Sequence, residues 1–297
     1  MKFNITVQKP WDSVLSNSEK LGGPSPFGNS KWGDFRKCPY LFYWKHVKRM
    51  QSVRLSDPLE IGGLYHEMRA RYYSTYLTCE AIGDMNQKDI DQRCLGSARD
   101  LLSKVYDVAP HTANIAGNLF DAWVVLYGPG MPGDDRTDTY EVEPLFEVTE
   151  PFPYSARIDR WGISEFGPVI TEIKTGARRD GYLLQSYPLD PQFIGQVYLW
   201  KRCREKQYGK LESFFVDLAT KTSPVSCYRE PVEIDNRVLK HWEKSMMLHH
   251  SNLVQCKASR LWAQNHGYQC RYCELVEHCS SGKQDSTDWV KKKKGEY

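Results

Sequence analysis

Near residue 139 the hydrophobic pattern of this chain changes its period. Residues 139–175 alternate between apolar and polar side chains, as β-strands do, in the runs TYEVEPLFEV, YSARIDRWGI and PVITEIKT. Helical periodicity surrounds this stretch, at 39–50, 59–77, 87–107 and 113–127 before it and at 193–205 and 233–257 after it. Two more strands are expected at 211–219 and 225–232. The sequence therefore predicts helices first and then an α/β core.

Composition narrows the class of protein. A chain of 297 residues can form one or two domains with a sizeable core, and its 13% aromatic content argues against disorder. It has no run of 18 or more apolar residues and no secretory signal pattern at its N-terminus, so we expect a cytoplasmic protein without a membrane partner. The formal net charge is +3, so a nucleic-acid binder of this composition would concentrate its basic residues locally.

Turn-forming residues and cysteine content divide the chain into four predicted regions. These are a loop region at 1–30, a helical region at 31–138, the α/β core at 139–257 and a cysteine-rich segment with a basic tail at 258–297. Loops are expected at 17–34, 128–135 and 176–191. Residues 78–138 carry no recognisable motif and are expected to form a helical insertion. The four lysines at 291–294 are expected to form a solvated end.

Two acidic residues are predicted to meet on neighbouring strands. Side chains two positions apart in a strand share a face, so Glu172 and Lys174 point the same way. Asp159 lies thirteen residues before Glu172, and the intervening Gly162 and Gly167 suit a hairpin-like return. That return would bring Asp159 beside Glu172.

Converging carboxylates repel each other unless a cation lies between them. Oxygen ligands favour a hard ion, Mg²⁺ or Mn²⁺. Lys174 would then orient or deprotonate a water molecule and offset the charge that develops on a phosphorane-like transition state. The pattern of an Asp followed by Glu-x-Lys is short, however, and a surface hairpin with alternating charges and a salt bridge also explains it.

Two further polar residues fall on predicted apolar helix faces. His66 lies on the apolar stripe of the helix at 59–77, and Gln196 on that of the helix at 193–205. A buried histidine or amide with satisfied hydrogen bonds explains each residue taken alone. The complete order of His, Asp, Glu-x-Lys and Gln is much rarer by chance.

This order of residues resembles the PD-(D/E)xK nuclease superfamily in its RecB-like exonuclease branch. The matching segments are GGLYHEM, SARIDRW, TEIKTG and FIGQVYLW. The resemblance implies a restriction-endonuclease-like core, with a mixed central sheet flanked by helices. The catalytic Mg²⁺ or Mn²⁺ would be held by His66, Asp159 and Glu172. The Ile173 carbonyl would be a further ligand, Lys174 would act on the attacking water, and Gln196 would position the site or the DNA.

The chain departs from the family pattern after the glutamine. Trp200 stands four residues after Gln196, where the family usually has Tyr. If His66 is a ligand, activity is expected to fall at acidic pH, because imidazole binds metal in its neutral form.

The resemblance also implies the substrate. The expected function is that of a metal-dependent DNA exonuclease or end-processing nuclease, with a preference for single-stranded DNA or DNA ends. Arg178 and Arg179 are candidates for binding phosphates, although a surface charge pair also explains them. Tyr182, with Tyr187 and Tyr40, is a candidate for stacking on unpaired bases. The alternative is a non-catalytic DNA-binding or assembly module. Partners in a recombination or CRISPR integration complex, or further copies of the chain, fit either function.

The end of the chain carries closely spaced cysteines. Cys270, Cys273 and Cys279 form a C-x2-C-x5-C pattern, and three thiols this close favour a metal cluster. Zinc and cubane iron–sulfur sites both take four ligands, and the best fourth candidate is Cys38, which lies 232 positions before Cys270. His278 or Cys256 would instead complete a zinc site.

One early cysteine followed by C-x2-C-x5-C resembles the iron–sulfur staple of the AddB nuclease domain and of the CRISPR-associated exonuclease family numbered four. The early segment FRKCP, followed by FYW, matches too. The resemblance implies a structural [4Fe–4S] cluster on Cys38, Cys270, Cys273 and Cys279 that joins the two ends of the chain, with zinc as the alternative metal. The other five of the nine cysteines, at positions 79, 94, 203, 227 and 256, are expected to be small core residues.

Overall fold

A five-stranded mixed sheet forms the centre of the computed structural model, which describes residues 25–52, 57–222, 224–281 and 289–291. The strand order is β2-β5-β6-β7-β8, in which β6 and β7 are parallel and the other neighbours are antiparallel. These strands are β2 (Thr139–Val142), β5 (Arg160–Ser164), β6 (Gly167–Gly176), β7 (Ser213–Thr220) and β8 (Ser226–Pro231). The predicted α/β class with a mixed central sheet is confirmed.

Helices and two small sheets surround this centre. The helices are α1 (Asn29–Lys37), α2 (Pro39–Phe42), α3 (Asp57–Ile82), α4 (Gln87–Tyr106), α5 (Pro110–Tyr127), α6 (Gly181–Ser186), α7 (Pro191–Cys203), α8 (Glu205–Tyr208), α9 (Asn236–Ser259) and α10 (Val276–Ser281). Short helical turns are η2 (Tyr43–Val47), η3 (Arg136–Asp138), η4 (Tyr187–Leu189) and η5 (Tyr268–Tyr272). The small sheets pair β3 (Leu145–Val148) with β4 (Tyr154–Arg157) and β1 (Met50–Ser52) with β9 (Trp289–Lys291).

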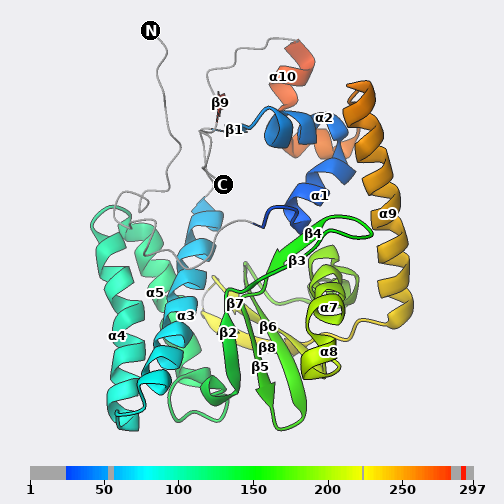
Figure 1. Cartoon of the computed structure of the whole chain (residues 1–297). Coiled ribbons are helices and arrows are strands. Elements are labelled where there is room, and N and C mark those ends of the chain that lie inside the picture. The colour runs from blue at the N-terminus through cyan, green and yellow to red at the C-terminus, as the bar shows by residue number, and fades with distance from the viewer. Residues whose placement is uncertain (1–24, 53–56, 223, 282–288, 292–297) are drawn as a thin grey trace.

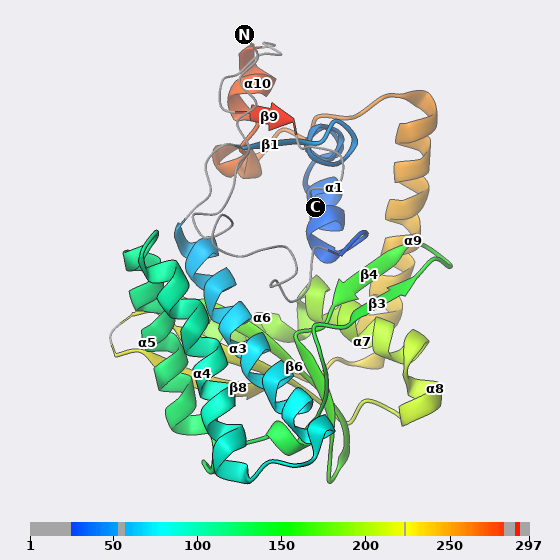
Figure 2. The same ribbon diagram turned by 60° about the vertical axis from the view of Figure 1, so that its left-hand side comes forward.

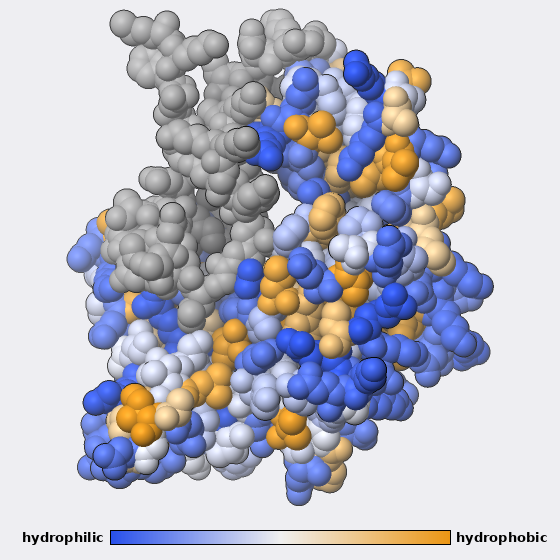
Figure 3. Space-filling view, viewed as in Figure 1, coloured by the Kyte–Doolittle hydropathy of each residue, from blue (hydrophilic) through white to orange (hydrophobic). Residues whose placement is uncertain are grey.

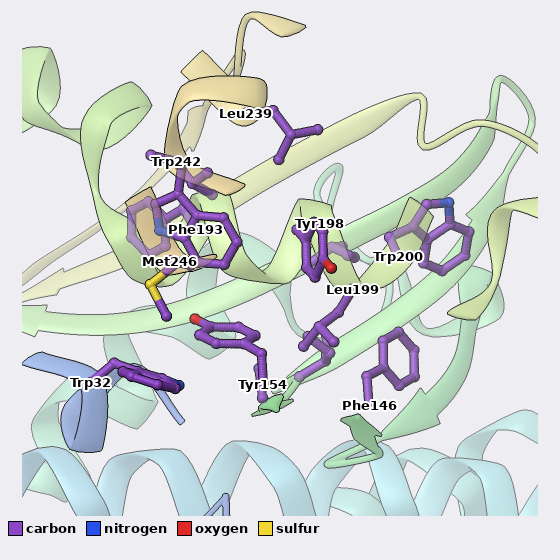
Figure 4. Close-up of a cluster of buried hydrophobic side chains, with 14 of the residues drawn as sticks. Trp32, Phe146, Tyr154, Phe193, Tyr198, Leu199, Trp200, Leu239, Trp242 and Met246 are labelled. Carbon is purple, nitrogen blue, oxygen red and sulfur yellow. The ribbon is translucent and has the colours of Figure 1, made fainter. Parts of the chain in front are cut away.

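Helices cover both faces of the central sheet (Figures 1 and 2), and each face packs against its own hydrophobic core. Ile170 and Ile173 of β6 are an odd number of residues apart and therefore point to opposite faces. Ile173 packs with residues of α3, α4 and α5. Residues 78–138 are mainly helical, as predicted. Ile170 packs with α1, α7 and α9, where Trp242 and its aromatic neighbours fill the space (Figure 4).

Two predicted strands are each broken in two. The run expected at 139–148 divides into β2 and β3, and the run expected at 154–163 divides into β4 and β5. Pro144 cannot donate to a strand ladder, and Glu143 before it has a φ of 55° in the left-handed region. The chain therefore turns out of the central sheet at Glu143 and returns to it at Asp159.

Two predicted loops contain helices. Residues 29–34, expected within a loop, belong to α1, which forms because Trp32 and Phe35 are buried in the core. The loop expected at 176–191 contains α6, whose first turn is capped by Asp180: its side chain accepts a hydrogen bond of 2.8 Å from the Leu183 amide. The predicted loop at 1–24 and the lysines at 292–294 lie outside the described residues.

The N-terminal helices contact the C-terminal segment (Figure 1). The Tyr40 amide donates to the Ala263 carbonyl at 3.0 Å, and the Asn265 side chain donates to the Lys37 carbonyl at 3.3 Å. The Lys45 ammonium lies 2.6 Å from the Glu274 carboxylate. Segments more than 200 residues apart in sequence are therefore joined by direct contacts.

Helix α7 approaches β4 closely at Gly195. A Cβ atom at this position would lie 2.0 Å from the Tyr154 hydroxyl. We expect Gly195→Ala to destabilise the protein by about 1–3 kcal/mol despite the better helix propensity of Ala. The matched control is Gly96→Ala in α4, where a Cβ meets nothing within 4 Å, and stability should rise by about 0.5–1 kcal/mol. Thermal unfolding of the two variants measures this, and equal melting temperatures would contradict it.

Within the described residues no helix is long and apolar enough to cross a membrane. Figure 3 shows a surface on which hydrophilic residues predominate and apolar ones form small separate groups.

Candidate active site

The hairpin of β5 and β6 brings the two predicted acidic residues together. Arg160 pairs with Thr171, so Asp159, one residue before β5, lies opposite Glu172. Asp159 Oδ2 accepts a hydrogen bond of 2.6 Å from the Ile173 amide. Asp159 is 8% exposed and Glu172 is 1% exposed, so this is a buried site and not the surface hairpin that the short motif also allowed.

Glu172 is fixed by donors from its own strand and from α7. Lys174 Nζ donates to Glu172 Oε1 at 2.7 Å and to Gln192 Oε1 at 2.8 Å. Gln196 Nε2 donates to Glu172 Oε2 at 2.6 Å, and Gln192 Nε2 donates to Oε1. Glu172 and Lys174 lie on one side of β6 as predicted, and the Nε2 atom of the buried Gln196 amide has Glu172 as its acceptor.

His66 of helix α3 lies close to Asp159. The helix can lie close to β6 because Gly62 has no side chain: a Cβ there would be 2.9 Å from Thr175 Oγ1. His66 Nδ1 lies 3.6 Å from Asp159 Oδ2. Among the described residues, His66, Glu143 and Asp159 form one group that could hold a metal ion. One ligand atom from each lies within 4.8 Å of the other two.

Glu143 is a site residue that sequence reasoning missed. It lies within a run of alternating residues, where it looked like one more polar position of a strand. Pro144 was the available signal, because a residue before proline at the end of a strand marks a turn in the chain. The turn directs the Glu143 side chain toward Asp159 and His66.

The pKa values of the three carboxyl groups are shifted from their usual range. Burial, with the charges of Asp159 and Glu172, raises the pKa of Glu143 to about 9. Burial and the Asp159 charge raise the pKa of Glu172 despite the opposing effect of Lys174. Burial works against ionisation of Asp159 as well, but His66 and Lys174 lower the pKa of Asp159 below its usual range. The Asp159 charge thus raises the pKa of both neighbouring glutamates.

These residues fit a divalent metal ion. Imidazole nitrogen and carboxylate oxygens are good ligands for Mn²⁺ and related ions. A cation would turn the repulsion among Glu143, Asp159 and Glu172 into attraction. Gln196 Oε1 is buried without a hydrogen-bond partner among the described residues.

Four of the predicted DNA-contacting residues lie after β6, and the fifth, Tyr40, lies in α2. Arg178 is exposed and pairs with Asp180 at 3.0 Å. Arg179 pairs with Glu230 of β8. Tyr182 is 89% exposed at the start of α6. Tyr187, by contrast, is buried against Phe193 and has no exposed ring face for a base.

The four cysteines of the predicted cluster lie where the two ends of the chain meet. Cys38 separates α1 from α2, and the other three belong to the C-terminal segment. Burial raises the pKa of the Cys273 and Cys279 thiols, and the charges of Cys38 and Cys270 raise it further. Among the described residues, no three of these sulfurs lie within 4.8 Å of one another. Of the other five cysteines predicted to be core residues, those at 79, 94 and 227 are buried, whereas those at 203 and 256 are only partly buried at the edge of the core.

A mixed sheet that brings Asp159 beside Glu172 and Lys174 of β6 is the arrangement that the resemblance to restriction-endonuclease-like nucleases implied. The sequence pattern of the PD-(D/E)XK nuclease superfamily matches residues 28–280. The chain therefore belongs to the PD-(D/E)XK nuclease superfamily, whose members use divalent metal ions.

The fold is similar to that of a solved structure. A protein from Eubacterium rectale assigned as an exonuclease is 11% identical over 90% of this chain and 91% of that chain, with a TM-score of 0.54. At this identity the likeness shows the fold alone. A second structure, SSO0001, is 16% identical over 71% of this chain and 94% of that chain, and its TM-score of 0.31 supports no conclusion. No curated protein sequence matches the chain significantly.

Proposed function

We propose that this chain is a divalent-metal-dependent DNA exonuclease or end-processing nuclease that prefers single-stranded DNA or DNA ends. The observation that carries the proposal is the contact set around Glu172. Lys174 Nζ lies 2.7 Å from Glu172 Oε1, and Asp159 lies beside Glu172 with His66 Nδ1 at 3.6 Å. The assignment of the Eubacterium rectale protein as an exonuclease is consistent with this proposal.

Each side chain has a role in this proposal. His66, Asp159, Glu172 and the Ile173 carbonyl would hold Mg²⁺ or Mn²⁺. When bound, the ion supplies Lewis-acid chemistry at the scissile phosphate. Lys174 would orient the attacking water and offset charge on the transition state. Gln196 would keep the Glu172 carboxylate in place through its 2.6 Å hydrogen bond.

The residues after β6 would guide the DNA strand. Tyr182 offers an exposed ring, and stacking of a base on such a ring contributes roughly 1–3 kcal/mol. Arg178, paired at the surface with Asp180, could exchange this partner for a phosphate at little cost, because exposed ion pairs are weak. Arg179 would have to leave Glu230 to bind a phosphate, so Arg178 is the stronger candidate of the two.

An assay on end-labelled DNA tests the function. Purified full-length protein should shorten single-stranded oligonucleotides from an end in Mg²⁺ or Mn²⁺ and should stop when EDTA is added. Cleavage of circular single-stranded DNA at the same rate would contradict an exonuclease. Binding without cleavage under every metal would instead identify the non-catalytic DNA-binding module.

We further propose that Cys38, Cys270, Cys273 and Cys279 hold a structural [4Fe–4S] cluster. The contacts between the two ends of the chain support this, because they bring the four thiols into one region. Four sulfurs around one zinc ion would lie about 3.8 Å apart, since tetrahedral Zn–S bonds are about 2.3 Å long. Each ligand of a cubane binds a different iron, so a wider spacing of the thiols suits that cluster better.

Cys273→Ser should remove the iron and weaken the junction of the chain ends. Anaerobically purified wild-type protein is expected to be brown and to contain iron and sulfide, and the variant should lose both and unfold at a lower temperature. Cys203→Ser, which changes a half-buried cysteine outside the set, is the matched control. Zinc without iron in the wild-type protein would refute the cluster and favour the zinc alternative.

A further inference from the structure

A groove runs between α3 and α4 on the surface of the protein. The two helices lie side by side and are joined by residues 83–86 (Figure 2). The groove has a volume of about 600 Å³, which is within the range of ligand-binding sites. It is lined by residues of both helices, and none of them belongs to the candidate active site.

The lining of this α3–α4 groove is cationic and polar. Arg71 of α3 and Arg93 and Lys104 of α4 supply three cations. Among the described lining residues, Asp100 is the acidic one. Hydroxyl groups come from both helices, those of Thr75 and Ser97 among them. Guanidinium, ammonium and hydroxyl groups are the side-chain groups with which proteins bind phosphate oxygens.

Two of the cations differ in a way that suits a charged ligand. Arg93 is exposed, and its side chain makes no ion pair or hydrogen bond with a described residue. Arg71, by contrast, is half-buried and is held by the Glu67 carboxylate at 3.3 Å. A side chain that is already held loses less conformational entropy when it binds a ligand. The groove therefore offers one cation in a fixed orientation and one that can adjust.

Gly96 leaves the middle of the groove open. A Cβ at this position would meet nothing within 4 Å, so no side chain of the described structure fills the space. Glycine in a helix interior is less stable than alanine, but it allows a ligand to approach the backbone closely. This open position is an observation independent of charge, and it too indicates a ligand in the groove.

The groove has the length of a short stretch of nucleic acid. Arg93, Ser97 and Lys104 lie on one face of α4, because they follow one another at helical spacing. At a rise of about 1.5 Å per residue, Arg93 and Lys104 are about 16 Å apart along the helix. Neighbouring phosphates of one DNA strand are about 3.4 Å apart along the helix axis, so this length matches about five phosphates.

The groove faces away from the carboxylates of the candidate active site. Arg71 follows His66 on α3 at a spacing that places the two side chains about 140° apart around the helix. His66 faces Asp159, so Arg71 faces another direction. A ligand in the groove would therefore be held without contact to the predicted catalytic residues.

We propose that the α3–α4 groove binds the sugar–phosphate backbone of DNA at a distance from the active site. This inference rests on the proposed nuclease function and adds a second contact with the substrate. The formal net charge of the chain is only +3, so DNA binding requires cations that are gathered locally, as they are in this groove. Because phosphates are the same at every base, the groove strengthens binding without reading the sequence.

Binding of a fluorescent single-stranded oligonucleotide to the full-length protein in EDTA tests this inference. EDTA prevents metal-dependent cleavage, so the affinity is measured by itself. Loss of one phosphate contact in Arg93→Ala should reduce the slope of log K against log salt concentration by about 0.7. This change corresponds to a loss of affinity of about eightfold at about 0.05 M salt and about threefold at about 0.2 M salt.

Arg99→Ala is the matched control. Arg99 also lies on α4, but it pairs with Asp121 of α5 at 3.2 Å and does not line the groove, so its variant should bind DNA as the wild type does. Gly96→Leu fills the groove and leaves its charges in place, and it should weaken binding as well. Leucine favours a helix, so this variant should fold.

Equal affinities of the wild type, Arg93→Ala and Gly96→Leu would overturn the inference, and so would equal losses in Arg93→Ala and Arg99→Ala. If the affinity for polyglutamate falls by the same factor in Arg93→Ala, the groove takes acidic proteins, which also overturns it.

Two further results separate the groove from the proposed function. Groove-dependent DNA binding by a wild type that cleaves no DNA in Mg²⁺ or Mn²⁺ would refute the function and leave the groove as a DNA site. Cleavage of DNA by a wild type whose groove variants bind equally tightly would refute the groove and leave the function.

Discussion

Lys174→Met should reduce the rate of DNA cleavage about 10²–10⁴-fold. Met keeps most of the apolar stem and removes the ammonium group, which lies 2.7 Å from Glu172 Oε1 and 2.8 Å from Gln192 Oε1. Glu172 retains Gln192 and Gln196 as donors, so the carboxylate should stay in place. The substitution should therefore slow the chemical step of cleavage, and the affinity for DNA should change much less.

Single-turnover cleavage of end-labelled DNA measures this effect. Lys201→Met, at an exposed position of α7, makes the same change of charge and should cleave at the wild-type rate. A thermal melt of each variant shows whether it folds. A folded Lys174→Met protein with wild-type activity would remove Lys174 from the mechanism and weaken the proposed function.

Asp217→Ala should destabilise the fold by about 3–5 kcal/mol. Asp217 is 3% exposed and accepts from Arg69 Nη2 at 2.7 Å and from Arg229 Nε at 2.7 Å. Arg69 is fully buried, and its guanidinium lies 4.2 Å from the centre of the Trp123 ring. Without Asp217, the Arg69 guanidinium would be buried between the sheet and α3 with no carboxylate beside it. Burying an unpaired charge in this way is costly in free energy.

Urea unfolding compares this variant with Asp121→Ala. Asp121 pairs with Arg99 at 3.2 Å through side chains that are 63% and 55% exposed, so its loss should cost less than about 1 kcal/mol. Equal losses of unfolding free energy in the two variants would contradict the argument that burial makes the Asp217 ion pair costly to break.

The Asp217 network also predicts a pH dependence of stability. Burial opposes ionisation, but Arg229 and Arg69 hold the pKa of Asp217 well below its usual range. A lowered folded-state pKa stabilises the protein above the unfolded value of about 3.9, and this stabilisation is lost as the pH falls through the folded-state value. The difference in unfolding free energy between wild type and Asp217→Ala should therefore shrink below about pH 4.

The relative positions of Asp159, Glu172 and Lys174 could be predicted from the sequence, because they depend on local strand and hairpin geometry. The two-residue repeat of a strand puts Glu172 and Lys174 on one side, and the hairpin after Gly162 sets Asp159 opposite Glu172. The roles of these residues as metal ligands and catalysts stay predictions. Strand ends were predicted less well, since one residue with φ of 55° divided a continuous pattern into two strands.

Contacts between distant parts of the chain could not be predicted from the sequence pattern. Gln192 lies just before the helix predicted at 193–205 and belongs to no recognised motif, yet it bonds both Glu172 and Lys174. Arg69 lies 148 positions before Asp217, and nothing local marks either as half of a buried ion pair. The meeting of Cys38 with the C-terminal segment was expected from the cysteine spacing, but the cluster itself stays a proposal.

The sequence by itself determined the α/β class, the order of the helices and strands, and the hairpin that joins Asp159 to Glu172, because periodicity and turn chemistry act over a few residues. The tertiary structure alone decided that Glu143 reaches Asp159 and His66, and that Gln192 and Gln196 fix Glu172. These contacts depend on the path of the chain between elements, where a single backbone turn at Glu143 redirects a side chain that the strand pattern would have left facing elsewhere.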